Sequence, residues 1–219
     1  MTDRPDRLRI AFFGGAFDPP HLGHRAVAQA VLAAGRSDRV LWVPSYRPPH
    51  KNPAGMVSFD DRLAMTELAA AAVPGSFVSD IEKRKQFEPS YTIRVLAALA
   101  EEFPEARMQL LIGSDSLEEL HTWYRARELA DRYEVITYPR RPAHDGAVRL
   151  PEEFWGAERA ETLRKSVLNG NFVEISSTEL RNALENGGKC VHIMEEAVLS
   201  YIRQHGLYGI SPQPGGERL

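Results

Sequence analysis

Two histidines stand three residues apart, a few residues after a glycine pair. The stretch GGAFDPPHLGH spans residues 14–24 and places His21 and His24 shortly after Gly14 and Gly15. An imidazole can donate a hydrogen bond to a phosphate oxygen, and it adds positive charge when protonated. Glycine lets a ligand approach the backbone, and the N–H groups of a helix start attract anions. We therefore predict a phosphate site here, in preference to a solvated turn or a zinc site, since no cysteine or nearby carboxylate cluster completes a zinc ligand set.

A second candidate anion site lies near the end of the chain, in ISSTELR, residues 175–181. Ser176 and Glu179 fit a capping box, which is a purely structural role. Arg181 is expected in the first turn of the same helix, where the helix dipole disfavours a cation. A cation at a position that the helix dipole disfavours suggests that an anion pairs with Arg181.

Both stretches need a scaffold, and the rest of the sequence predicts one. Short apolar runs alternate with helical patterns. The runs expected to form strands are 9–13, 40–43, 77–79, 108–112, 133–138 and 171–175. The expected helices are 22–34, 59–72, 91–102, 116–131 with a break, and 158–168. This alternation predicts an α/β fold with a Rossmann-like, doubly wound parallel sheet, which binds ligands at the carboxyl ends of its strands.

The last part of the chain has a different pattern. Helices are expected at about 178–186 and 191–204 with no strand between them, which predicts a small C-terminal helical region. We expect a single domain made of a core at about 8–175, a helical cap at about 176–207 and a mobile tail at 209–219. Residues 139–157 form a long irregular connection, which in compact domains is often a functional loop.

Composition narrows the classes of function. The chain has 219 residues, 43% of them hydrophobic, and a formal net charge of -3, which argues against nucleic-acid binding. The only cysteine, Cys190, excludes a disulfide framework. No signal peptide or apolar run of about 18 residues is present, so we expect a cytoplasmic protein that does not enter a membrane. The G-x-x-x-x-G-K-[ST] and G-x-G-x-x-G phosphate motifs are absent as well.

Residues 14–24 closely resemble the [GST]-G-x-F-D-P-x-H-x-G-H signature of the nucleotidyltransferase α/β-phosphodiesterase superfamily. Residues 175–181 are similar to the I-S-S-T-x-[IL]-R motif of bacterial nicotinate-mononucleotide adenylyltransferases. VPSYRPPHK at 43–51 and LLIGSDSLEELHTW at 110–123 resemble two further motifs of that family. The resemblance implies that the chain joins ATP and nicotinate mononucleotide into deamido-NAD and pyrophosphate, with Mg²⁺ carried by ATP and no metal site of the protein's own. Related enzymes are often homodimers, which makes a homodimer an open expectation.

The resemblance also implies roles for individual residues. The implied catalytic residues are His21, His24, Lys51 and Arg181. The implied ATP-binding residues are Gly14, Gly15, Phe17, His21, His24, Gly113, Asp115, Ser176, Ser177, Thr178 and Arg181. The implied mononucleotide-binding residues are His50, Lys51, Tyr91, Thr92, Trp123, Tyr124 and Arg141.

The departures from the family pattern fall on the acceptor side. PSYTIRVL at 89–96 is similar to the family's P-S-Y-T-x-D-T-L, but Arg94 and Val95 replace the usual aspartate and threonine. Ala143 replaces the glycine of the R-P-G element that Arg141 begins. Nicotinamide mononucleotide or another phosphorylated acceptor, such as phosphopantetheine, therefore stays open. The alternative that the chain is a nucleotide-binding regulator that has lost catalysis also stays open.

Overall fold

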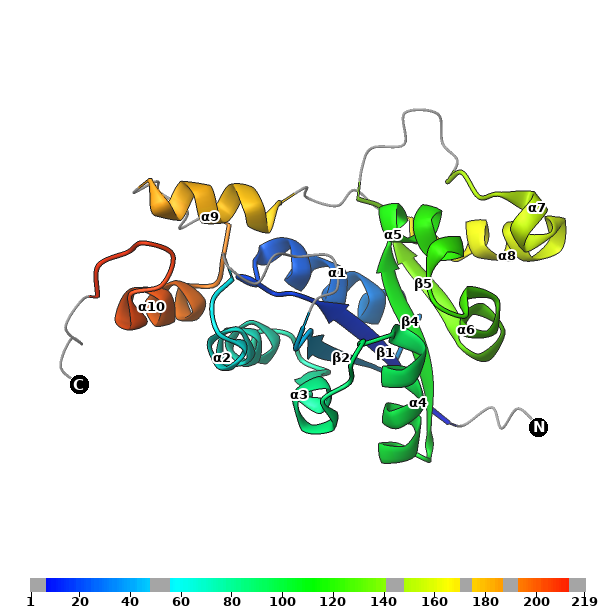
Figure 1. Cartoon of the computed structure of the whole chain (residues 1–219), viewed down its shortest axis with the longest axis horizontal. Coiled ribbons are helices and arrows are strands. Elements are labelled where there is room, and N and C mark those ends of the chain that lie inside the picture. The colour runs from blue at the N-terminus through cyan, green and yellow to red at the C-terminus, as the bar shows by residue number, and fades with distance from the viewer. Residues whose placement is uncertain (1–6, 48–55, 141–147, 170–174, 187–192, 213–219) are drawn as a thin grey trace.

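Five parallel strands form the centre of the computed structural model, which describes residues 7–47, 56–140, 148–169, 175–186 and 193–212. The strands are β1 (Leu8–Gly15), β2 (Arg39–Pro44), β3 (Ser76–Val78), β4 (Ala106–Gly113) and β5 (Glu134–Tyr138), in the order β3-β2-β1-β4-β5 (Figure 1). Every neighbouring pair is parallel, which confirms the predicted fold class.

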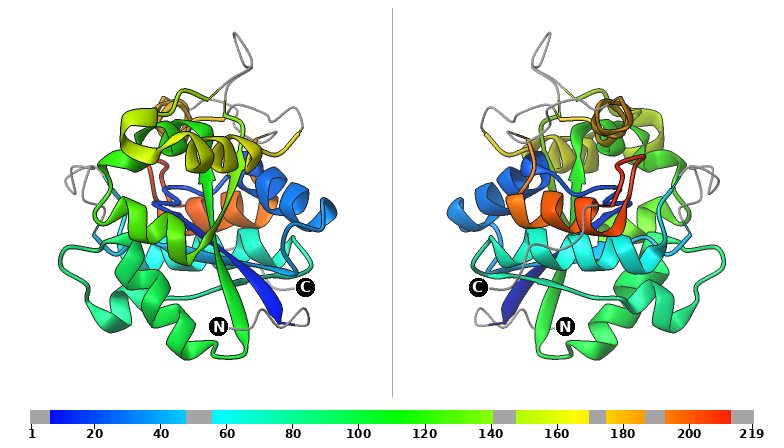
Figure 2. Two further views of the ribbon diagram at one scale, coloured as in Figure 1. Left: turned by 90° about the vertical axis from the view of Figure 1, so that its right-hand side faces the viewer. Right: turned by 90° about the vertical axis from the view of Figure 1, so that its left-hand side faces the viewer.

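Helices cover both faces of this sheet (Figure 2). One face packs against α1 (Leu22–Ala33), α2 (Phe59–Ala71), α9 (Ser177–Glu185) and α10 (Glu196–His205). The other face packs against α3 (Ile81–Lys85), α4 (Thr92–Glu102), α5 (Ser114–Glu119), the 3-10 turn η2 (Leu120–Thr122), α6 (Ala126–Arg132), α7 (Glu152–Trp155) and α8 (Ala157–Lys165). Side chains of a strand alternate between faces, so a strand covered on both sides must be apolar throughout. In β1, Ala11 and Phe13 enter one core while Ile10 and Phe12 enter the other.

The strand order changes direction at β1. From β1 the chain adds β2 and then β3 on one side, and it returns to place β4 on the other side of β1. The carboxyl ends of β1 and β4 therefore form the topological switch point, where open α/β sheets bind ligands. Gly15 and Gly113 are the last residues of these two strands.

Most predicted elements are confirmed, with four corrections. The expected helix 116–131 breaks into α5, η2 and α6, and Arg125 takes a left-handed φ of 56° just before α6. The connection 139–157 is not irregular throughout, because α7 lies in its described part. The expected helix 191–204 begins only at Glu196, and α3 was not predicted.

Some predictions fall beyond the described residues. Of the sixth expected strand, 171–175, only Ile175 is described, and most of the expected tail lies outside as well. The single-domain organisation with a C-terminal cap remains a prediction.

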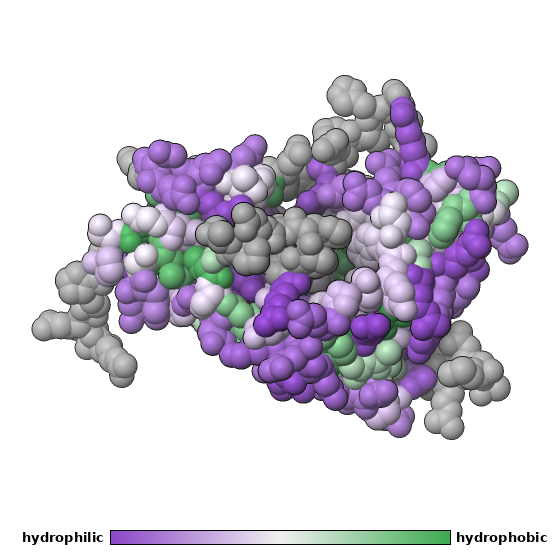
Figure 3. Space-filling model, in the orientation of Figure 1, coloured by the Kyte–Doolittle hydropathy of each residue, from purple (hydrophilic) through white to green (hydrophobic). Residues whose placement is uncertain are grey.

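Within the described ranges, no helix has both the length and the apolar character needed to cross a membrane. The face drawn in Figure 3 is mostly hydrophilic.

Candidate active site

The two histidines at the start of α1 lie against each other, as their spacing predicts. The centroids of the His21 and His24 rings are 3.8 Å apart, and both residues are buried. The backbone N–H of His21 donates to Nδ1 of His24 over 3.2 Å. Nδ1 of His24 is therefore an acceptor, and a neutral His24 ring carries its proton on Nε2. Phe17 packs edge-on to His24 at 5.0 Å and is only 1% exposed, so the structure places Phe17 as a support for this ring.

His21 is held as a neutral side chain. Burial, and secondly the positive charge of Arg140, lower the pKa of His21 to about 4. A Cβ on Gly23 would lie 3.0 Å from Cε1 and Nδ1 of His21, so the absence of a side chain at Gly23 lets the imidazole fold back over the helix start. At neutral pH His21 can thus act as a hydrogen-bond donor rather than as a cation.

The neutral state of His21 predicts a pH dependence of stability. Because the pKa is about 4 in the folded protein and 6.5 as the ordinary value, an unfolded chain binds a proton between these pH values that the folded chain does not. The free energy of unfolding should be highest above pH 6.5 and fall by up to about 3 kcal/mol as the pH drops towards 4. Urea unfolding near pH 7.5 and near pH 5 measures this loss. His21→Gln should remove part of it, and an equal loss in both proteins would contradict the assignment.

The amides at the start of α1 are less available than predicted. Leu22 N–H donates to the carbonyl of Ile193 over 3.0 Å, and His24 N–H donates to the carbonyl of His21 over 2.9 Å. The expectation of anion-binding amides at this helix start is therefore wrong for these two groups. These two N–H groups are therefore not available to an anion at this helix start.

Arg181 brings the second motif to the first, across a separation of 163 residues. Its Nη1 donates to the backbone carbonyl of Asp18 over 2.7 Å, and its Nη2 donates to Oγ1 of Thr178 over 3.2 Å. The hydroxyl of Ser177 donates to the carbonyl of Pro19 over 3.3 Å. The predicted phosphate residues of both motifs therefore lie at one place, beside the carboxyl end of β1.

Helix α9 begins as predicted, but Arg181 lies further along it than expected. The hydroxyl of Ser176 accepts from the N–H of Glu179 over 3.5 Å, which confirms the N-cap half of the predicted capping box. Arg181 is the fifth residue of α9, so its expected place in the first turn is wrong. Oδ2 of Asp18 lies 3.6 Å from Nη1 of Arg181, and the pairing of Arg181 with a bound anion stays a prediction.

At the end of β4, Gly113 makes room for a carboxylate. A Cβ on Gly113 would collide with Oδ1 of Asp115 and lie 3.2 Å from Cδ of Arg140. Nη1 of Arg140 pairs with Oδ2 of Asp115 over 3.1 Å. Oδ1 of Asp115 is buried and accepts no hydrogen bond within the described part of the chain. Asp115 therefore offers an unused acceptor at the switch point.

The predicted acceptor residues are partly brought together. Tyr91 and Tyr124 stack with ring centroids 4.2 Å apart, and Arg94 lies over them at 5.2 and 5.7 Å. Thr92 is the first residue of α4, and Trp123 is half-buried against the core. The predicted residues His50, Lys51 and Arg141 lie outside the described residues.

Several residues around the site were missed by the sequence analysis. The missed residues are Asp18, Arg62, Glu82, Arg140 and Tyr208. Arg62 donates to the carbonyl of Ala16 over 2.8 Å, and the Glu82 carboxylate accepts from the N–H of Tyr46 over 2.9 Å. Burial raises the pKa of Glu82. Two of them carried a signal in the sequence. Asp18 is the aspartate of the signature at residues 14–24, and Arg140 follows the last residues of an expected strand and so had to lie at the carboxyl edge.

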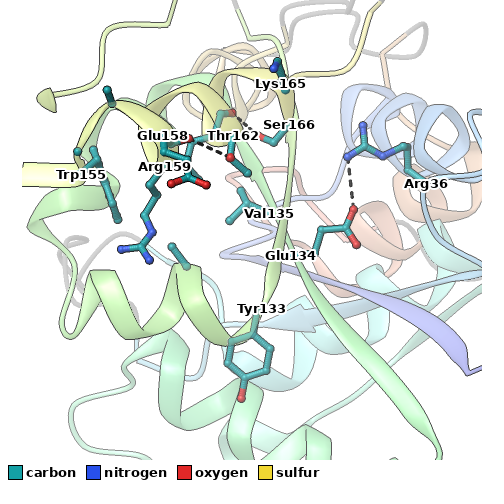
Figure 4. Close-up of a pocket in the computed structure, with 14 residues that line it drawn as sticks. Arg36, Tyr133, Glu134, Val135, Trp155, Glu158, Arg159, Thr162, Lys165 and Ser166 are labelled. Carbon is teal, nitrogen blue, oxygen red and sulfur yellow. Dashed lines mark hydrogen bonds and ion pairs between the residues drawn. The ribbon is translucent and has the colours of Figure 1, made fainter. Parts of the chain in front are cut away.

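A cavity of about 670 Å³ lies elsewhere, beside the first residues of β5 and between α6 and α8 (Figure 4). None of the predicted site residues lines it. Four of its charged side chains already have partners, since Arg36 pairs with Glu134 over 3.5 Å, Lys165 pairs with Glu161 over 3.4 Å, and Arg159 pairs with Asp131. The predicted chemistry and this cavity are therefore separate features.

Comparison with known proteins adds a second line of evidence. A model of the cytidylyltransferase-like family matches residues 12–186. The chain is 39% identical over 204 residues to a protein of Synechococcus sp. (strain JA-3-3Ab) named "Probable nicotinate-nucleotide adenylyltransferase", covering 93% of this chain and 96% of that relative. A relative of the same name from Gloeobacter violaceus is 37% identical over 204 residues, covering 92% of this chain and 97% of the relative.

Solved structures have the same fold. The Plasmodium falciparum nicotinic acid mononucleotide adenylyltransferase complexed with NaAD superimposes with a TM-score of 0.73, covering 94% of this chain and 100% of that one. Its sequence is only 19% identical, so this similarity concerns the fold.

Proposed function

Because this chain belongs to the cytidylyltransferase-like family and, within it, to the nicotinate-nucleotide adenylyltransferases, we propose that it transfers the adenylyl group of ATP to nicotinate mononucleotide. The products are deamido-NAD and pyrophosphate, which is a step of NAD biosynthesis. The observation that carries this proposal is the contact of Arg181 with Asp18, which joins the two phosphate motifs at the switch point.

The proposed reaction depends on positioning and on charge. The phosphate of the mononucleotide attacks the α-phosphorus of ATP in line, its oxygen forms the new P–O bond, and pyrophosphate leaves with the electrons of the broken bond. The attacking phosphate is already an anion at neutral pH, so no general base is required. His21 and His24 donate hydrogen bonds to the triphosphate, and Arg181 offsets its negative charge.

The remaining predicted residues hold the two substrates in this proposal. Gly14 and Gly15 let ATP approach the end of β1, and Asp115 accepts hydrogen bonds from ribose hydroxyls. The N-terminal residues of α9, Ser176, Ser177 and Thr178, line the phosphate side. His50 and Lys51 hold the attacking phosphate. The mononucleotide ring lies near Tyr91, Thr92, Trp123, Tyr124 and Arg141.

Mg²⁺ would enter with ATP and neutralise part of the triphosphate charge. Mg²⁺ usually keeps several waters and binds through substrate phosphates with few protein ligands. No three His, Cys, Asp or Glu side chains gather into a metal cluster within the described ranges. We propose that the ion is bound through the phosphates of ATP. We also propose that the enzyme works in the cytoplasm. A homodimer stays an open expectation, which light scattering on the purified protein can test.

A pyrophosphate-release assay with both mononucleotides tests the proposed function. Turnover with ATP and nicotinate mononucleotide is expected, with a lower kcat/KM for nicotinamide mononucleotide. Pyrophosphate release with nicotinamide mononucleotide and not with nicotinate mononucleotide would assign nicotinamide mononucleotide as the acceptor. Tight ATP binding with no turnover on either mononucleotide would support the inactive regulator and overturn the proposal.

Trp123 provides a test of the acceptor site. A flat aromatic side chain can stack on a pyridine ring, and the triphosphate residues lie on other elements. Trp123→Ala should therefore raise KM for the mononucleotide far more than KM for ATP. Steady-state kinetics with each substrate varied in turn measures both values. Trp123→Phe keeps an aromatic face and should retain most of the affinity, whereas equal KM increases for both substrates in Trp123→Ala would argue against stacking.

A further inference from the structure

Tyr208, in the segment that follows α10, reaches the first phosphate motif from 190 residues away. Its hydroxyl donates to Oδ1 of Asp18 over 2.6 Å. Asp18 is 1% exposed and Tyr208 is 7% exposed, so the bond is shielded from water. Burial and the charge of Asp18 raise the pKa of Tyr208, which keeps the hydroxyl proton in place as a donor. A short hydrogen bond to a buried carboxylate is one of the stronger contacts available to a hydroxyl.

Asp18 connects this hydroxyl to Arg181. The backbone carbonyl of Asp18 accepts from Nη1 of Arg181, and Oδ2 of Asp18 lies 3.6 Å from the same nitrogen. Oδ2 is buried and accepts no hydrogen bond within the described residues. The Arg181 side chain remains 19% exposed, whereas the Asp18 side chain is fully buried. Of these three side chains, Arg181 is the one best placed to contact a ligand.

The backbone around Tyr208 is adapted to this contact. Tyr208 has a left-handed φ of 54°, and Gly206 and Gly209 on either side have φ values of 64° and 74°. A side chain at a left-handed position costs free energy that glycine avoids. The bond to Asp18 gives a physical reason for this conformation.

We propose that Tyr208 is a positioning residue for adenylyl transfer, acting through Asp18 on Arg181. By occupying Oδ1, the hydroxyl prevents the carboxylate from turning to form a two-oxygen pair with the guanidinium. Arg181 then keeps N–H groups and charge for the triphosphate. This inference rests on the proposed role of Arg181 in ATP binding.

Without the hydroxyl, both oxygens of Asp18 are buried and lack hydrogen bonds. Such a carboxylate is strongly attracted to the nearest cation. Arg181 is the cation at ion-pair distance, because its Nη1 lies 3.6 Å from Oδ2 of Asp18. Arg62 is buried, and its Nη1 donates to the carbonyl of Ala16, while its Nε has no hydrogen-bond partner within the described residues. The carboxylate would draw the guanidinium towards itself and away from the ligand.

A double-mutant cycle tests this connection. Tyr208→Phe should weaken ATP binding, measured by titration calorimetry without an acceptor, by about tenfold, as expected for one hydrogen bond to a charged group. In the Arg181→Ala background the same change should have almost no further effect. Tyr201→Phe is a matched control, because Tyr201 also donates to a carboxylate, Oδ1 of Asp61 over 3.0 Å, but ties α10 to α2. This control should leave ATP binding unchanged.

Equal weakening by Tyr208→Phe in both backgrounds, or no weakening at all, would overturn the inference. If Tyr208→Phe does not fold, as judged by its Tm, Asp18→Asn tests the same connection. Asp18→Asn should change ATP affinity in the wild-type background and leave it unchanged in the Arg181→Ala background. An equal change in the two backgrounds would overturn the inference. Failure of the proposed function can be distinguished from failure of this inference. A wild-type protein that binds ATP without turnover would refute the proposed reaction, while the double-mutant cycle would still measure the coupling of Tyr208 to Arg181 in ATP binding.

Discussion

Replacing His24 with alanine should lower kcat/KM by roughly ten- to a few-hundredfold while the fold stays intact. Nδ1 of His24 accepts from the backbone, so the ring is oriented with Nε2–H as its donor. A hydrogen bond to a charged group contributes about 1.5 to 3 kcal/mol, and more if it tightens only in the transition state. Steady-state kinetics with saturating mononucleotide and varied ATP measures the loss.

The control for His24 is another histidine, His205, which is exposed at the end of α10. His205→Ala should keep the wild-type kcat/KM. Because His24 is buried against Phe17, the Tm of each variant has to be measured alongside the kinetics. A normally folded His24→Ala enzyme with full activity would refute the role of this ring.

Arg181→Ala should have a comparable or larger effect, about a hundredfold on kcat/KM. The guanidinium is the cation that joins the two motifs, and its loss removes a charge that the triphosphate needs. It also leaves the buried Asp18 carboxylate without its 3.6 Å partner, so stability should fall by on the order of 3 kcal/mol. Kinetics and urea unfolding measure the two effects separately.

Two further variants sharpen the Arg181 test. Arg181→Lys keeps the charge but not the planar fork, so it should recover activity only in part. Arg203→Ala removes a half-exposed arginine of α10 that pairs with Glu196 over 3.6 Å, and it should change neither kcat/KM nor ATP affinity. An Arg181→Ala enzyme as active as Arg203→Ala would show that the guanidinium does not act on the substrate.

The sequence was most informative where local pattern and chemistry coincide. The run RIAFF is apolar throughout because β1 is covered on both faces, and the following glycines and prolines mark the turn into α1. The spacing of His21 and His24 places their rings on one side of a helix start, and their 3.8 Å separation confirms this. The shared position of residues 14–24 and 175–181 followed from strand polarity and from the family resemblance together.

What the sequence could not predict depends on contacts between distant residues. The depressed pKa of His21 arises from its burial and from Arg140, which lies on another strand end. The bond from Tyr208 to Asp18 spans 190 residues and has no local signature. The sequence predicted free N–H groups at the start of α1, but the N–H of Leu22 donates to the carbonyl of Ile193. This acceptor is distant in sequence, so no local pattern could reveal it. The helix α3 is only five residues long, which is too short for a period to be recognised.

A crystal structure with bound ATP is the most direct test of the central claim. The account predicts that the triphosphate lies at the carboxyl ends of β1 and β4, within hydrogen-bond distance of His21, His24 and Arg181. Nucleotide bound elsewhere, for instance in the cavity between α6 and α8, with these three side chains making no contact to phosphate, would contradict it.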